Sequence, residues 1–539
     1  MNSGELSFHF INSVLVTIAV ALFVLWRYRL AVLNGMQQGE SAVLDWTAAI
    51  AHALTTTPPG DLLAYERAMR RRISAAWLLT TAICALPMAM GYMFASKMGQ
   101  SPTYALGLTF CYMVATLPMI AVSLAWPPRR SILALGAMLL GFAALFLLSA
   151  VIERSMAGRP IEWRIFGIVP LFFDMVWNQL WMAGVFWLLS WPARLRGVVP
   201  ITFAAILLFG LAPLAGSRLT ALLAASEFGT PWAIRLGMNG VFLLIALPIG
   251  WLAWLRLRRL AADYAAKRFS DAQLLARMWW LMLVATIGLD IMLGCDMPLF
   301  ALLLSVTAIG AFAPVNQWSM ARFGVHARAA ARPAQTLLLL RVFGYTARTE
   351  RLFDRVAARW RLLGPVTMIA APDVTARTID AGDYLRWLTG RLDESFVTSR
   401  TNLDARLAAL DLHPDPDGRF RINEFCCRAS TWQATVVELM ARADAVIMDV
   451  RGMTTAQRGC EFELQQLAQR MAAQRVVLVI DQTTDQAMLR TALGSSMEKV
   501  RLIEIRSATD IDRAFLALAN TGAANNQRLI RINATLPLK

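Results

Sequence analysis

Charged and aromatic residues that could bind a ligand follow apolar runs in the C-terminal part of the chain. Each run has the length of a buried strand, and helical patterns separate the runs. This alternation predicts a parallel sheet with helices on both faces, which binds ligands beyond the carboxyl ends of its strands. The candidate ligand-binding residues at these ends are Arg341, Phe343, Tyr345, Asp373, Asp449, Arg451, Gly452 and Asp481.

Asp449 and Arg451 form the most suggestive pair among these candidates. One residue separates them, so both point to the same side of an extended chain. An arginine can hold a phosphate while an aspartate holds a ribose hydroxyl, and together they could bind a nucleotide. A local salt bridge between the two side chains is the competing interpretation.

Glu463 is the candidate catalytic residue. It lies near the start of a helix predicted from Cys460 to Ala473, where the helix dipole is expected to keep it ionised. A carboxylate on one face of a sugar can stabilise or trap the oxocarbenium-like state formed when an N-glycosidic bond breaks. Glu461 points to a different side of the helix and cannot replace it. The competing interpretation of Glu463 is a solvated helix residue or a partner of the helix terminus.

Several common site types are not indicated by the sequence. There is no GxxxxGK[ST] loop, no GxGxxG after a strand and no GxSxG elbow, which argues against ordinary P-loop ATPases, dinucleotide dehydrogenases and lipase-like hydrolases. The six cysteines form no CxxC pair and the four histidines are scattered. We therefore expect no metal site and no disulfide framework.

The run from Cys460 to Leu464 reads Cys-Glu-Phe-Glu-Leu and matches a Cys-x-x-Glu-Leu helix start. With this motif the C-terminal domain resembles TIR (Toll/interleukin-1 receptor-like) domains and the related nucleoside deoxyribosyltransferases. The resemblance implies a flavodoxin-like fold and NAD or another nucleotide as ligand or substrate. It also implies that Glu463 occupies the position of the glutamate that cleaves the glycosidic bond of NAD.

Two further segments bear on this resemblance. Phe343 and Tyr345 stand where the family has Phe-Ile-Ser-Tyr, and Ala381-Gly382 resembles a Pro-Gly loop that mediates self-association. The sequence departs from the pattern because Gly459 replaces the motif's tryptophan and Ala381 the proline. A longer segment than the family usually has before the strand at Ala445 predicts an insertion at about residues 393–430.

The N-terminal part carries long apolar runs that the C-terminal part lacks. The whole chain is 57% hydrophobic and 16% charged. Residues 1–330 hold 24 Lys/Arg and 13 Asp/Glu (+11), and residues 331–539 hold 28 and 23 (+5), which together give +16. We predict a multi-pass α-helical membrane domain over residues 1–325, a linker over 326–335 and a cytosolic α/β domain with a mainly parallel, flavodoxin-like sheet over 336–539.

The apolar runs predict nine membrane spans, with eight as the alternative. The predicted spans are Phe8–Trp26, Ile73–Phe94, Tyr104–Trp126, Ser131–Ile152, Ile165–Trp191, Val198–Gly216, Ile234–Leu255, Trp279–Gly294 and Pro298–Gln317.

The distribution of basic residues predicts the orientation of these spans. With nine spans and the N-terminus outside, inner loops hold 18 Lys/Arg and outer loops hold six. The positive-inside rule then places the N-terminus in the periplasm and the C-terminal domain in the cytoplasm of a bacterial inner membrane. The excess of basic residues in the inner loops explains much of the positive net charge, so we do not expect nucleic-acid binding. The expected partners are the lipid bilayer and, through the cytosolic domain, a second copy of the chain.

Polar residues within the predicted spans are candidates for a transport path. Asp174 and Asn178 share one helix face, and Asp290 lies in the eighth span. Intramembrane acids often serve as proton or ion relays, although hydrogen bonding between helices is the competing role. Three hypotheses follow: a signalling or sensing protein with a nucleotide- or partner-binding domain, a membrane-tethered NAD glycohydrolase, and a transporter with a regulatory domain.

Overall fold

The structure is a computed structural model of the 539-residue chain. It describes residues 3–37, 61–95, 109, 112–113, 116–124, 126, 128–156, scattered positions within 201–223, then 230–294, 297–341, 347–370, 381–388, 390–428, 430–454, 457–470, 476–498, 500–506 and 508–519. The chain divides into two compact units, and the division falls inside two helices. A helical unit comprises Met1–Leu25 and Ser74–Phe323, and an α/β unit comprises Trp26–Ile73 and Gly324–Lys539.

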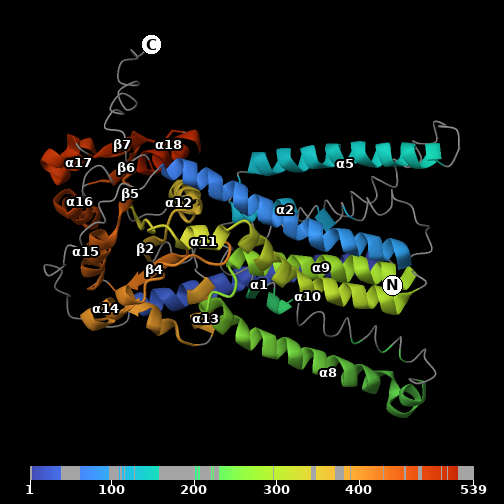
Figure 1. The fold of residues 1–539 in the computed structure, drawn as a ribbon. Helices are drawn as coiled ribbons and strands as arrows, with labels where there is room; N and C mark the ends of the chain where they lie inside the picture. Colours follow the sequence, from blue (N-terminus) through green and yellow to red (C-terminus); the bar gives the residue numbers. More distant parts are fainter. Residues whose placement is uncertain are drawn as a thin grey trace. The chain divides into compact units, whose positions relative to one another are not determined.

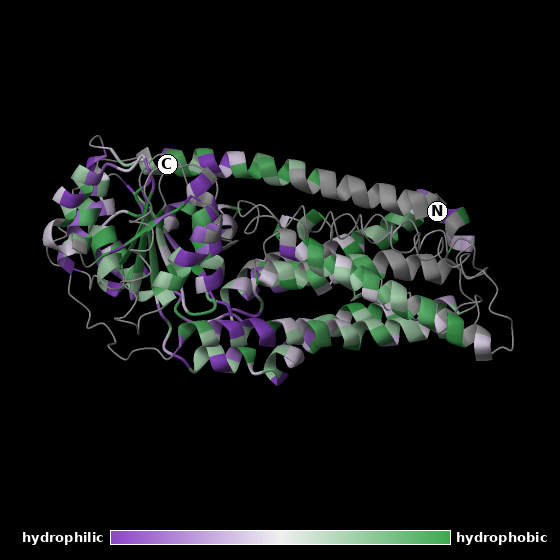
Figure 2. Cartoon of the chain, turned by 90° about the horizontal axis from the view of Figure 1, so that it is seen from above, coloured by the Kyte–Doolittle hydropathy of each residue, from purple (hydrophilic) through white to green (hydrophobic). Residues whose placement is uncertain are grey.

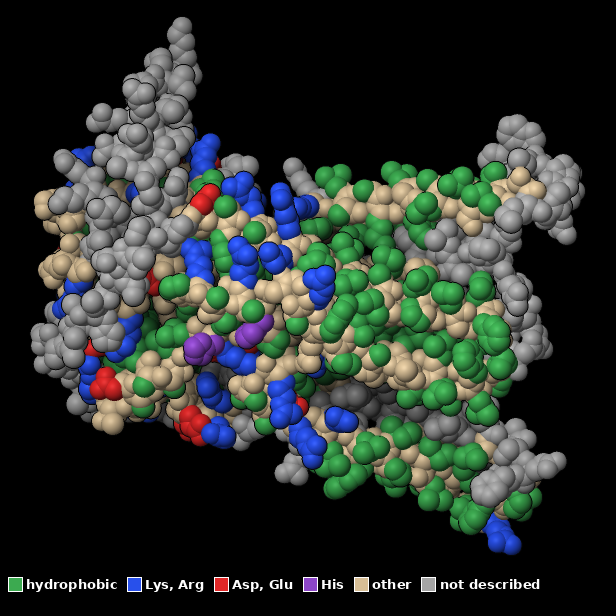
Figure 3. All heavy atoms as spheres, in the orientation of Figure 1, with side chains coloured by type: hydrophobic (Ala, Val, Ile, Leu, Met, Phe, Trp, Pro, Cys, Tyr) green, Lys and Arg blue, Asp and Glu red, His purple; other side chains and the backbone are tan. Residues whose placement is uncertain are grey.

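Long apolar helices make up the helical unit (Figure 1). Hydrophobic residues run along most of their length in Figure 2, and hydrophobic side chains cover the visible faces of α5 and α8 in Figure 3. The helices are α1 (Ser3–Gln37), α2 (Leu62–Ala95), α4 (Thr116–Ser123), α5 (Pro128–Met156), α8 (Thr230–Ala265), α9 (Asp271–Gly294) and α10 (Pro298–Arg322).

Five of the described helices are long and apolar enough to cross a membrane. Their apolar stretches are Ala19–Met36, Leu62–Ala95, Arg130–Ser149, Asn239–Arg256 and Pro298–Arg322. The predicted span 165–191 lies outside the described residues, and 104–126 and 198–216 lie partly outside them. The predicted span 279–294 is helical as part of α9 but is not among the five.

Buried polar and aromatic contacts join α2, α9 and α10. The side-chain Nε2 of Gln273 donates to Asn316 Oδ1 over 2.9 Å, and Asn316 Nδ2 donates to Thr80 Oγ1 over 3.3 Å. Trp280 stacks on Phe312 with ring centroids 5.1 Å apart. Buried hydrogen bonds of this kind hold apolar helices together.

The α/β unit is built on a seven-stranded, all-parallel sheet with the order β3-β4-β2-β1-β5-β6-β7. Five of its strands, β2-β1-β5-β6-β7, follow the order of flavodoxin-like folds. β4 and β3 extend the sheet beyond β2, and both come from the segment predicted as an insertion. The strands are β1 (Leu337–Arg341), β2 (Val366–Ala370), β3 (Phe396–Val397), β4 (Ile422–Cys427), β5 (Ala445–Asp449), β6 (Val476–Ile480) and β7 (Arg501–Glu504).

Helices cover both faces of this sheet, and the strands alternate between two hydrophobic clusters. In β1, Leu338 and Leu340 face the cluster formed with α15, α16 and α17, whereas Leu337 and Leu339 face the cluster formed with α12 and α18. The helices of the unit are α11 (Val325–Ala330), α12 (Ala347–Trp360), α13 (Ala381–Leu388), α14 (Arg400–Ala408), α15 (Trp432–Arg442), α16 (Arg458–Arg470), α17 (Gln486–Leu493) and α18 (Ala508–Ala519), with 3-10 turns η3 (Leu392–Ser395) and η5 (Gly494–Glu498).

The topology places a switch point between β1 and β5. After β1 the chain passes to β2 on one side of it, and after the added strands it returns to β5 on the other side. The two strands pair in register, with Arg341 opposite Asp449 at their carboxyl ends. Ligands of open parallel sheets bind at such a point, so the fold directs attention to these two residues and their neighbours.

Candidate functional site at the carboxyl edge of the sheet

Five of the predicted ligand-binding residues lie at the described carboxyl edge. Arg341 ends β1, Asp449 ends β5, Arg451 and Gly452 follow β5, and Asp481 follows β6. The predicted residues Phe343, Tyr345 and Asp373 lie outside the described residues.

Asp449 and Arg451 form an ion pair with each other. Arg451 Nε donates to Asp449 Oδ1 over 2.8 Å, and Nη2 donates to Oδ2 over 2.7 Å. Both side chains are buried, with 2% of Asp449 and 9% of Arg451 exposed. The geometry is the two-pronged one that a guanidinium and a carboxylate prefer. The local salt bridge considered as an alternative for this pair is therefore what the structure contains.

The loops after β5 and β6 are fastened together. Thr484 Oγ1 donates to the carbonyl oxygen of Val450 over 3.2 Å, and the backbone N–H of Asp485 donates to the carbonyl oxygen of Met453 over 3.2 Å. Gly452 lies between these anchors with φ +72°, a conformation that favours glycine. The two loops therefore form one braced rim on the β5–β6 side of the switch point.

Asp481 belongs to the same rim. Partial burial acts to raise its pKa, but hydrogen bonds from Thr483 Oγ1 and N, at 2.6 and 3.0 Å, hold the pKa below its ordinary value. The charge of Arg451 and a bond from Thr484 act in the same direction. Asp449, Arg451 and Asp481 thus form a cluster whose charges are compensated within the chain.

Glu463 differs from this cluster because one of its oxygens has no partner. It is 5% exposed, and its Oε2 makes no hydrogen bond among the described residues. Burial raises the pKa of Glu463 to about 8, although the charge of Arg341 acts to lower it. The prediction that Glu463 stays ionised is therefore wrong at neutral pH, because burial penalises the charged form of its side chain. At neutral pH the side chain is mainly a carboxylic acid.

Cys460 sits one helical turn before Glu463 and contacts the end of β1. Its thiol donates to the carbonyl oxygen of Arg341 over 3.9 Å, and its side chain is fully buried. This contact fastens the start of α16 to the switch point. The resemblance drew attention to Glu463, but no motif indicated this contact. The apolar stripe of Cys460, Leu464 and Leu467 was the signal that this side of the helix faces the core.

The predicted site residues are divided between the two faces of the sheet. By strand alternation, Arg341 and Asp449 face the α12–α18 side together with Leu339 and Ile447. Glu463 comes from α16, which packs on the opposite face. The two groups meet only at the edge, where the field of Arg341 reaches Glu463. A ligand that touched both groups would have to lie across the ends of β1 and β5.

The polar residues predicted within membrane spans are only partly described. Asp174 and Asn178 lie outside the described residues, and Asp290 is helical in α9 while its side chain lies outside them. Among the residues that the structure describes, no group of three His, Cys, Asp or Glu side chains is placed to hold a metal ion.

Comparisons with known proteins find no relative of this chain. No protein-family model, curated protein or solved structure matches the chain.

Proposed function

We propose that the α/β unit binds a small polar ligand at the switch point between β1 and β5, and that Glu463 contacts this ligand. The apolar helices would hold the protein in a bacterial inner membrane, with the N-terminus in the periplasm and the α/β unit in the cytoplasm. The role would be sensing or signalling, with the ligand as the signal. Self-association through the α/β unit, suggested by Gly382, would be part of the response.

The unpartnered oxygen of Glu463 carries this proposal. A buried carboxyl group costs free energy unless its oxygens are hydrogen-bonded, so such a group needs a reason to be kept. Every carboxylate of the neighbouring rim is bonded within the chain, whereas Glu463 has an oxygen available. Strongly perturbed acids in such positions are frequent at functional sites.

The protonation of Glu463 points to a class of ligand. A neutral carboxylic acid both donates and accepts a hydrogen bond, so it suits an amide or a nucleobase edge. A cationic group would instead draw off the proton and pair with the carboxylate. NAD offers both features, because its nicotinamide carries an amide and a positively charged ring.

NAD is therefore the first probe. Binding would be measured by calorimetry on the full-length protein in lipid nanodiscs, beside Glu463→Ala and the matched control Glu461→Ala on the same helix. We expect binding that is lost in the first variant and kept in the second, with proton release between pH 6 and pH 8. Equal binding by the wild type and Glu463→Ala would contradict a role for this residue.

NAD glycohydrolysis is the second candidate function, and the free oxygen of Glu463 again favours it. In this reaction the bond between ribose C1′ and the nicotinamide nitrogen breaks, nicotinamide leaves with the electron pair, water supplies a hydroxyl to C1′, and the remaining proton of that water is released to solvent. Glu463 would stabilise the cationic sugar as a carboxylate, after the positive charge of the bound substrate has lowered its pKa. Release of nicotinamide by membranes containing the wild type, and its loss in Glu463→Ala alone, would support this function. NAD that binds without being consumed would exclude it.

A further inference from the structure

The first three turns of α2 pack on the α/β unit as one of its own helices. Leu62, Glu66, Met69 and Ile73 are each at most 2% exposed, and their spacing places them on one face of the helix. Leu62 belongs to the same hydrophobic cluster as Leu337 and Leu339 of β1. Figure 1 shows the start of α2 beside α18 and α12.

The ion pairs of Glu66 with Arg70 and Arg359, called the clasp below, hold this segment in place. Glu66 is 2% exposed and accepts hydrogen bonds from Arg359 Nε and Nη2, both at 3.2 Å, and it also pairs with Arg70. Arg359 lies over the ring of Phe515 at 3.8 Å and pairs with Asp512 at 3.4 Å. One guanidinium therefore joins α2, α12 and α18.

A second attachment involves α11 and the turn between α14 and β4. Tyr65 Oη donates to the carbonyl oxygen of Arg328 over 3.2 Å. Gly418 adopts φ +77°, and a Cβ atom there would lie 2.6 Å from Val325 Cγ1 and 3.1 Å from Met69 Cε. The turn thus approaches α2 and α11 as closely as a glycine permits.

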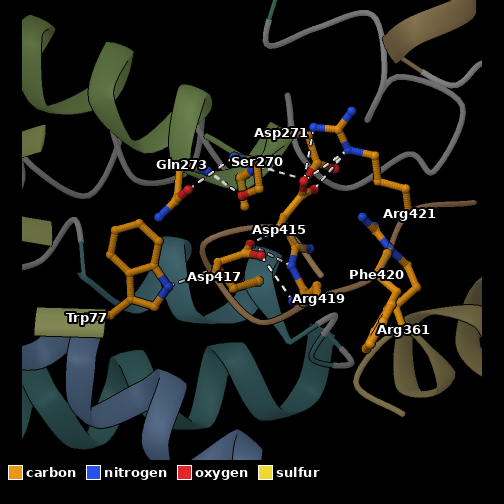
Figure 4. Close-up of polar contacts among 12 residues, drawn as sticks. Trp77, Ser270, Asp271, Gln273, Arg361, Asp415, Asp417, Arg419, Phe420 and Arg421 are labelled. Atoms are coloured by element: carbon orange, nitrogen blue, oxygen red, sulfur yellow. Dashed lines mark hydrogen bonds and ion pairs between the residues drawn. The ribbon is translucent and has the colours of Figure 1, made fainter. Parts of the chain in front are cut away.

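The turn itself is braced by ion pairs (Figure 4). Asp417 and Arg419 pair over 2.8 Å with 0% and 5% of their side chains exposed, and Asp415 pairs with Arg421 over 2.9 Å. Buried pairs of this kind resist distortion, because breaking one leaves a charge without a partner. The turn that receives Met69 is therefore held in shape by two ion pairs.

The candidate ligand site is closed in this structure. Glu463 is 5% exposed, Arg341 is 7% exposed and Cys460 is fully buried, so a ligand cannot reach them without an opening of the edge. β1 connects the two places, because Leu337 and Leu339 belong to the same hydrophobic cluster as Leu62 and the carbonyl oxygen of Arg341 accepts from the Cys460 thiol. The helix α2 also continues unbroken from Leu62 to Ala95, and it is apolar enough to cross a membrane.

We propose that residues 62–73 of α2 are a control helix: seated on the α12–α18 face they keep the β1 edge closed, and their release opens it. The proposal goes beyond the ligand-binding function, because it concerns the opening of the edge whatever the ligand is. A movement of the apolar part of α2 would then be transmitted to residues 62–73 through one continuous helix.

Thiol labelling of Cys460 tests the proposal without any ligand. The full-length protein in nanodiscs would carry Cys460 as its sole cysteine, and its rate of reaction with a maleimide would be measured with and without Glu66→Gln. We expect the variant to react at least about threefold faster, because the clasp loses a charge while its shape is kept. Tyr65→Phe, which removes only the bond to Arg328, should raise the rate by a smaller factor. Arg71→Gln on the exposed side of α2 should leave it unchanged.

A second background with Cys427 as the sole cysteine separates opening of the edge from general loosening. Cys427 is 7% exposed and lies on β4, two strands from β1. Faster labelling of Cys460 with unchanged labelling of Cys427 supports the control helix. An equal rise at both positions, or no rise at Cys460 in either variant, would overturn it and leave the segment as a static part of the core.

Discussion

Two buried glutamates of the α/β unit meet opposite surroundings. Glu66 is 2% exposed and is held by Arg70 and Arg359, whereas Glu463 is 5% exposed and keeps an oxygen without a partner. Burial alone therefore does not distinguish a structural acid from a functional one. The difference lies in whether the chain itself satisfies the carboxyl group.

Removing the clasped glutamate should have the largest effect. Glu66→Ala leaves Arg359 and Arg70 without their shared carboxylate, and we expect a loss of about 3–5 kcal/mol of unfolding free energy. Denaturant or thermal unfolding of the full-length protein in detergent would measure it. Arg71→Ala, an exposed change on the same helix, should stay within about 0.5 kcal/mol of the wild type. A similar small change for Glu66→Ala would remove the contrast between the two glutamates.

The turn that receives α2 should be the next most sensitive position. Gly418→Ala places an alanine in the left-handed backbone region and puts its Cβ atom 2.6 Å from Val325 Cγ1. We expect the free energy of unfolding to fall by about 2–4 kcal/mol. Gly390→Ala is the matched control, because Gly390 has φ +74° but nothing within 4 Å of the added carbon. It should cost only about 1 kcal/mol, the price of the backbone alone. Equal losses for the two variants would mean that the close approach to α11 and α2 has no energetic weight.

Breaking the Asp449–Arg451 ion pair should lower the free energy of unfolding by a smaller amount. Asp449→Asn leaves the guanidinium of Arg451 without its carboxylate, but Asp481 lies close enough to share the charge. We therefore expect a loss of about 2 kcal/mol, measured in the same unfolding assay. Asp449→Asn combined with Arg451→Met should recover part of it. A double variant less stable than the single one would show that Arg451 has another necessary partner.

Glu463→Gln should change the free energy of unfolding least at pH 6. The difference from the wild type should grow as the pH rises above 6. The pKa of Glu463 is raised from 4.5 to about 8, so the folded state holds a proton that the unfolded state has already lost. The stability of the wild type should therefore fall as the pH rises from about 4.5 towards 8, by roughly 2–2.5 kcal/mol between pH 6 and pH 8. Glu463→Gln, which has no proton to lose, should not show this fall, whereas Glu461→Gln should keep it.

Much of the α/β fold was predictable from local pattern. The strand-length apolar runs at 336–343, 365–370, 445–450 and 476–480 contain the parallel strands β1, β2, β5 and β6, because strands buried on both faces are apolar throughout. The extra strand β4 was also predictable, because residues 420–427 of the predicted insertion form a strand-length run rich in apolar side chains. The two-residue β3 (Phe396–Val397) was not, since so short a run carries no periodic signal.

The pairing of charges was much less predictable. Glu66 and Arg359 are 293 residues apart, and no local rule connects them. The position of α2 on the α12–α18 face depends on tertiary packing alone. Glu463 was selected by its motif, but its protonation was predicted wrongly because the helix N-terminus was weighted above burial. The apolar stripe on either side of Glu463 contained the information that the side chain faces inward.

Infrared difference spectroscopy would show whether the Glu463 side chain is protonated in the folded protein. Spectra of the full-length protein and of Glu463→Gln would be compared at pH 6 and at pH 9.5, in the region of the C=O stretch of protonated carboxylic acids. We expect a band at pH 6 that is absent from the variant and that disappears from the wild type with a midpoint near pH 8. Identical spectra of the two proteins at pH 6 would show that Glu463 is ionised there, and the contrast with Glu66 on which the proposed site rests would be wrong.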